Sequence, residues 1–170
     1  MTCITQAVLG KATLAVERMG MNERVGLADE VFARQLNLLA SVVVLRRMGA
    51  SDVQIETPLH VLLVSWQAIK SSGLQWPVIS EDDRDTCMRR LTAKARFVEG
   101  LSPALLDQAV AQQIAEHREQ YHLFAFAFGT LRANNLLGVA TDAEKCVLLA
   151  TLNLVECIAF VAPRPACAPR

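Results

Sequence analysis

The densest group of chemically capable side chains lies in residues 116–128, which read EHREQYHLFAFAF. Two glutamates, two histidines and one tyrosine precede three phenylalanines spaced two residues apart. Carboxylates and imidazoles bind transition metals and transfer protons. The segment therefore raises two hypotheses: a metal or catalytic site, or the place where a buried helix reaches the surface.

The first hypothesis depends on Glu119 and His122, which a helix presents on one face, one turn apart. Carboxylates combined with imidazole suit iron or manganese. The pair resembles, locally, the Glu-x-x-His motif of the di-iron carboxylate bundles, which carry this motif on two helices and add a glutamate from each of two others. This chain has no second Glu-x-x-His, so a metal site would need another ligand. Glu156 is a candidate because it interrupts an apolar helix, and a buried charge must be paired or metal-bound. Further carboxylates and imidazoles that could contribute are Glu17, Glu30, Glu56 and His60.

The second hypothesis rests on the aromatic half of the segment. His117, Tyr121, Phe124 and Phe128 follow one helical stripe, and Phe126 lies about half a turn away. A helix that is apolar on two faces is typical of a central helix surrounded by others. The same three phenylalanines could instead wall a pocket for a small apolar ligand, which the pattern does not distinguish from a core. We interpret His117 as a hydrogen-bonded core or interface histidine.

The start and stop signals along the whole chain are those of helices, and no stretch has a convincing strand pattern. Glycines end several of the apolar-periodic runs, and Thr141 with Glu144 forms a capping box before the last one. Thr57 followed by Pro58 has the form of a helix start. We expect six helices, over residues 3–19, 23–48, 57–71, 81–98, 103–135 and 142–161.

The sequence therefore predicts an all-α, single-domain bundle of about six helices with a long central helix at about 103–135. We assign residues 1–162 to the helical domain and residues 163–170 to a proline-containing, disordered tail. The segment 146–162 is apolar, but it is short for a membrane span and contains two polar residues, so we interpret it as a buried core helix.

Composition points to an apolar surface with a function. Nine apolar residue types make up 52% of the chain and charged residues only 20%, against about 45–50% and about 25% in typical domains. A homo-oligomer or a groove for a partner would cover such an excess. The 17 basic and 17 acidic residues balance, which argues against nucleic acid as the partner. The basic segment 89–96 follows an acidic turn and is typical of a solvated helix face.

Five cysteines without a C-x-x-C motif fit a reducing compartment, so the sequence favours a cytoplasmic protein. No nucleophile motif and no glycine-rich phosphate loop is present, which favours a non-enzymatic protein. Our first hypothesis is a protein-binding module, such as an adaptor, an inhibitor or a regulatory subunit, that self-associates. Its candidate binding residues are Trp66, Leu74 and Trp76, because aromatic anchors dominate interfaces. The alternative is a bundle that binds iron, manganese or a small apolar ligand through residues 116–128.

Overall fold

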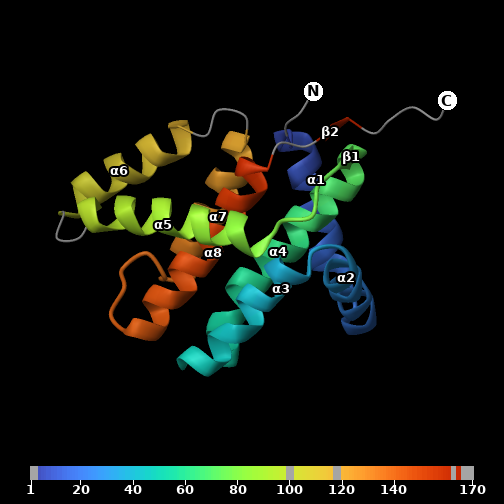
Figure 1. The fold of residues 1–170 in the computed structure, drawn as a ribbon, viewed down its shortest axis with the longest axis horizontal. Helices are drawn as coiled ribbons and strands as arrows, with labels where there is room; N and C mark the ends of the chain where they lie inside the picture. The colour runs from blue at the N-terminus through green and yellow to red at the C-terminus, as the bar shows by residue number, and fades with distance from the viewer. Residues whose placement is uncertain (1–3, 99–101, 117–119, 162–163, 166–170) are drawn as a thin grey trace.

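The computed structural model describes residues 4–98, 102–116, 120–161 and 164–165 of the 170-residue chain (Figure 1). Within these residues the protein is all-α, as the sequence predicts, with eight α-helices in place of about six. The helices are α1 (Gln6–Arg18), α2 (Met21–Arg34), α3 (Leu36–Val43), the 3-10 helix η1 (Val44–Met48), α4 (Asp52–Ser72), α5 (Glu81–Val98), α6 (Pro103–Glu116), α7 (Tyr121–Ala133) and α8 (Asp142–Phe160). Two short strands, β1 (Leu74–Gln75) and β2 (Arg164–Pro165), pair antiparallel.

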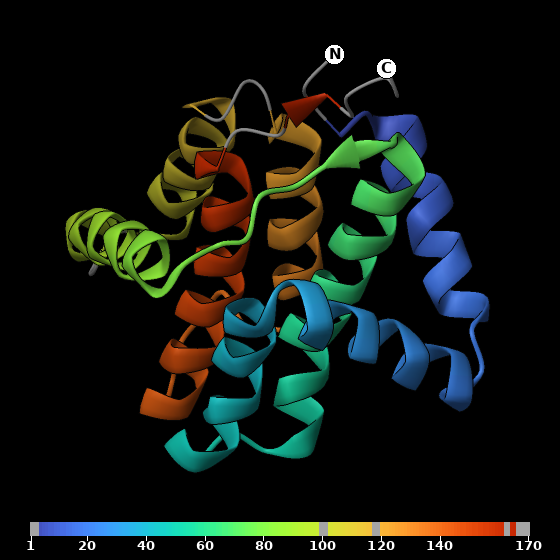
Figure 2. The same cartoon turned by 45° about the vertical axis from the view of Figure 1, so that its right-hand side comes forward.

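Helices α4 and α8 form the centre of the bundle. Helix α4 packs against α1, α2, α3, α7 and α8, and α8 packs against α3, α4, α5 and α7. Figure 2 shows α7 between α4 and α8, with α1 on one outer side and the α5–α6 pair on the other. Every residue of α8 from 151 to 158 is buried, as expected for a helix that has neighbours on all sides.

Several predicted helix boundaries are confirmed because local side chains cap them. Thr141 Oγ1 accepts a hydrogen bond from the Glu144 N–H at 3.2 Å, and Glu144 Oε2 accepts one from the Thr141 N–H at 3.3 Å. This capping box begins α8. Helix α5 has the predicted bounds, and Ser80 Oγ caps it by accepting from the Asp83 N–H at 3.1 Å.

The continuous helix expected over residues 23–48 is wrong, because the chain breaks at Gln35. The Gln35 backbone has φ −142° and ψ 52°, outside the helical region. Its buried side chain donates from Nε2 to the Pro77 carbonyl at 2.7 Å and accepts at Oε1 from the Ile79 N–H at 3.0 Å. At the break, one glutamine side chain thus satisfies two backbone groups of the connector between β1 and α5.

The helix start expected at Thr57 and Pro58 is also wrong, because α4 begins at Asp52, six residues before Pro58. Ser51 Oγ accepts from the Gln54 N–H at 3.3 Å, and Gln54 Oε1 accepts from the Ser51 N–H at 2.9 Å. This capping box starts the helix at Asp52. Thr57 and Pro58 consequently lie inside α4, both buried, where the proline removes one helical hydrogen bond.

The long central helix expected over residues 103–135 is wrong as well, because it is divided into α6 and α7. Gln120, immediately before α7, has φ −121° and ψ 26°, which is not helical. Its buried side chain accepts a hydrogen bond from the Ile4 N–H at 3.3 Å, 116 residues away in the chain. Two exposed ion pairs connect α6 to its neighbours: Glu116 pairs with Lys94 of α5, and Asp107 pairs with Arg132 of α7.

The predicted disordered tail is only partly within the described residues. Residues 164–165 pair with residues 74–75 instead of being free, and residues 163 and 166–170 lie outside the described part. In the part of the chain that the structure describes, no helix is long and apolar enough to cross a membrane.

Candidate protein-binding surface

The three phenylalanines of residues 116–128 belong to the interior. Phe124 and Phe128 lie in the hydrophobic core, at 0% and 5% exposure. Phe126 is half-buried, and its ring is 5.9 Å from the ring of His60 on α4. The three phenylalanine rings thus pack α7 against its neighbours in the hydrophobic core.

The polar residues of the segment and the third candidate ligand, Glu156, differ in their exposure to solvent. Tyr121 is exposed and its ring meets that of the half-buried His122 edge-on, with 5.4 Å between centroids. Glu156 is buried on α8. His117 and Glu119 lie outside the described residues, so metal binding by Glu119, His122 and Glu156 stays a hypothesis. Among the described residues, no group of three or more histidine, cysteine, aspartate or glutamate side chains is placed to hold a metal ion.

The predicted binding residue Trp66 lies inside the fold. It is only 6% exposed on α4. The carboxylate of Glu30 on α2 pairs with Lys70 of α4, and this contact lowers the pKa of Glu30. The buried indole N–H of Trp66 forms no hydrogen bond among the described residues. Trp66 is therefore not presented to solvent.

Leu74 and Trp76 are also engaged within the chain. Trp76 is half-buried, and its indole N–H donates to the Ile158 carbonyl of α8 at 3.2 Å. Leu74 is half-buried in β1, opposite Pro165. The connector that we expected to carry a binding anchor thus folds back over the end of the bundle.

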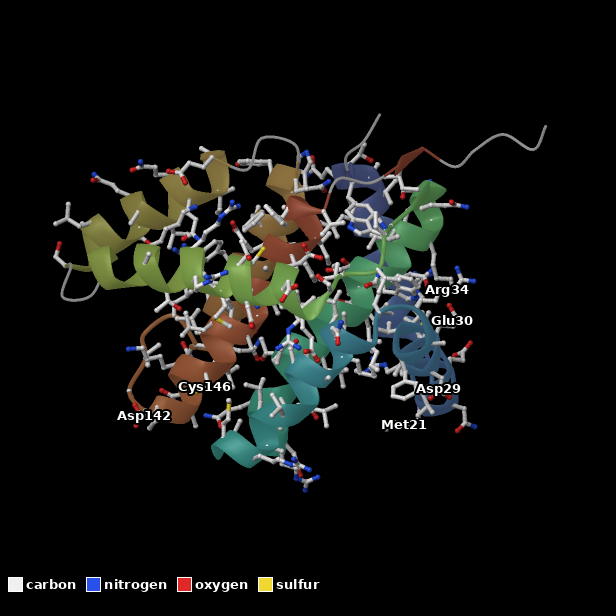
Figure 3. The ribbon with its side chains drawn as sticks, viewed as in Figure 1. Met21, Asp29, Glu30, Arg34, Asp142 and Cys146 are labelled. Atoms are coloured by element: carbon white, nitrogen blue, oxygen red, sulfur yellow. The ribbon has the colours of Figure 1, made fainter. Side chains whose placement is uncertain are left out.

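The most exposed apolar face belongs to α2, whose apolar stripe the sequence analysis did not propose as a binding surface. Met21, Val25 and Phe32 are 77%, 51% and 59% exposed, and Ala28 is half-buried between them. The spacing of four, three and four residues places all four side chains on one helical face. We call this face the α2 seam (Met21, Val25, Ala28 and Phe32). Figure 3 shows Met21 on the outer side of α2, away from the bundle.

Two oppositely charged side chains border the α2 seam. Arg24 lies on the edge nearer the bundle and Asp29 on the other edge, and both are exposed. Neither forms an ion pair in the part of the chain that the structure describes. After the break at Gln35, Leu36 of α3 is also half exposed, at 50%.

The sequence contains a signal for this face, but it is ambiguous. Residues 23–48 carry two apolar rhythms at once. The rhythm that includes Val25, Phe32 and Leu36 faces solvent, and the rhythm that includes Leu27 and Val31 is buried. Since both have helical spacing, only the position of the neighbouring helices decides which one is covered.

A second exposed apolar group surrounds η1, at the opposite end of α3 from α2. It consists of Val43, Val44, Met48 and Val53, at 62%, 38%, 53% and 76% exposure. Its members come from α3, η1 and α4 rather than from one face of one helix. Arg46 and Asp52 form an exposed ion pair beside it, 3.5 Å apart. The group is therefore less regular than the α2 seam.

Comparison with known proteins adds no further assignment: no family model matches the chain, and neither the curated proteins nor the solved structures contain a significant match to it.

Proposed function

We propose that this protein is a non-enzymatic, cytoplasmic protein-binding module, and that the α2 seam is its binding surface. One observation carries the proposal: three large apolar side chains stand on one face of one helix, each more than half exposed. Soluble monomers rarely leave such a stripe uncovered unless it is an interaction site. A regular helical stripe is the form in which one helix recognises another helix or a groove.

The exposure of the seam sets the scale of the interaction. Complete burial of a large apolar side chain is worth about 1.5–3 kcal/mol. Since Met21, Val25 and Phe32 are already partly covered, their burial by a partner would contribute roughly 3–6 kcal/mol in all. Association itself costs at least about 4 kcal/mol. The seam alone would therefore give weak binding, so flanking side chains must add contacts.

Photo-crosslinking tests the proposal. A benzophenone amino acid is placed at Met21, and separately at Lys11, which is exposed on α1. In cells that express the chain, we expect a crosslinked species of defined mass from position 21 and none from position 11. Adding Val25→Glu should remove the adduct, because it places a charge in the middle of the seam.

The control for this experiment is the fold of the variant. Val25 is half exposed, so Val25→Glu should leave the helical circular dichroism and the urea midpoint nearly unchanged. Adducts from positions 21 and 11 that are equally abundant, or a position-21 adduct that survives Val25→Glu in folded protein, would remove the seam as the binding surface.

A further inference from the structure

We propose that the α2 seam binds the α2 seam of a second copy of this chain, with the two helices parallel. The inference rests on the proposed function, since it names the occupant of the same surface. It also gives a structural form to the self-association that the apolar composition suggests.

The spacing of the seam is that of a two-stranded coiled coil. Met21, Val25, Ala28 and Phe32 repeat at intervals of four, three and four residues, which correspond to the core positions d, a, d and a of a heptad. In a parallel pair, each of these residues lies beside its own counterpart. The β-branched Val25 then occupies an a position, where parallel two-stranded coiled coils commonly place valine.

The charges that border the seam are complementary in the parallel arrangement. With this heptad, Arg24 occupies a g position and Asp29 the following e position. In parallel coiled coils, a g residue meets the e residue five positions later on the partner helix. Arg24 of each copy would therefore meet Asp29 of the other, twice by symmetry. An antiparallel pair brings like edges together and forfeits both contacts.

The direction of the bundle also favours the parallel arrangement. Leu27 and Val31 attach α2 to the rest of the protein, and they lie about 110° around the helix from the centre of the seam. A twofold axis parallel to the two helices places the two bundles on opposite sides of the pair. An antiparallel pair places both bundles on the same side of the pair, where they compete for the same space.

A charge-reversal series measured by sedimentation velocity tests the inference. The purified full chain is studied from about 5 to 300 μM, a range that covers weak dimers. Arg24→Asp and Asp29→Arg each replace two attractions by two repulsions, so each should weaken the dimer by about tenfold. The double variant restores opposite charges in exchanged positions and should restore dimerisation.

Arg34→Asp is the matched control. It changes the net charge by the same amount as Arg24→Asp, on an exposed part of α2 away from the seam. We expect it to leave the dimer unchanged. The parallel pairing is refuted if the Arg24 and Asp29 reversals leave the dimer dissociation constant unchanged. It is also refuted if the double variant fails to restore dimerisation.

The failure of this inference and of the proposed function can be told apart. A wild-type chain that stays monomeric throughout the concentration range refutes self-association through the seam. If the Met21 crosslink then joins the chain to a different protein and depends on Val25, the proposed function stands without this inference. If neither a dimer nor a seam-dependent crosslink is found, both are refuted.

Discussion

Replacing Gln35 by alanine should destabilise the protein strongly, although the residue lies at a break between helices. Gln35 is 2% exposed and bonds both the Pro77 carbonyl and the Ile79 N–H. Alanine removes both contacts and leaves two backbone groups of the connector without these partners. A buried polar group without a partner costs about 1–3 kcal/mol, so we expect a loss of about 2–5 kcal/mol in the free energy of unfolding.

Urea unfolding followed by circular dichroism measures this loss. With a slope of about 2 kcal/mol per molar urea, the midpoint should fall by roughly 1–2.5 M. Gln112→Ala, at an exposed position of α6, is the control and should change the free energy by less than about 0.5 kcal/mol. If Gln35→Ala were as stable as the control, the connector would not depend on this glutamine, and our reason for the break between α2 and α3 would be refuted.

Three further predictions concern caps, thiols and pH. Thr141→Ala removes the capping box of α8 and should cost about 1 kcal/mol, measured by urea unfolding; an unchanged midpoint would contradict the role of the cap. Burial raises the pKa of the Cys87 and Cys157 thiols, so iodoacetamide at pH 8 should label the partly exposed Cys146 before either of them; faster labelling of the buried pair, detected by peptide mass spectrometry, would refute their burial. Burial lowers the pKa of His60 below 6.5; the nearby Glu17 opposes this shift and Arg24 adds to it. At a pH just below 6.5 the unfolded chain therefore binds more protons than the folded chain. The free energy of unfolding should consequently fall as the pH is lowered below 6.5. His60→Gln should reduce this loss between pH 7 and pH 5, and an equal loss in the variant would assign it to other groups.

The helical class and the cap-defined boundaries could be predicted because they depend on local chemistry. Thr141 with Glu144 and Ser80 with Asp83 act within one turn of the chain, so the sequence shows them directly. The breaks at Gln35 and Gln120 could not be predicted. Each depends on a hydrogen bond to a residue distant in the sequence, at Ile79 or Ile4.

The binding surface could not be predicted for a related reason. Aromatic residues were natural candidates, but Trp66 is buried in the core and Trp76 donates a hydrogen bond to α8 once the chain has folded. Phe32 and Val25 lie in an ordinary amphipathic pattern, and their exposure depends on which of two apolar rhythms meets α4. Burial of one rhythm is decided by tertiary packing and not by spacing.

Methyl NMR can show whether the α2 seam is covered in the assembled protein. Met21 reports on the seam and Met48 on the exposed group around η1. Spectra of methyl-labelled methionine are recorded as the protein concentration is raised through the dimerisation range. We predict that the Met21 methyl resonance shifts and broadens while that of Met48 stays unchanged. If the Met21 resonance stays constant while the mass of the particle doubles, or if only Met48 shifts, the α2 seam is not covered in the assembled protein.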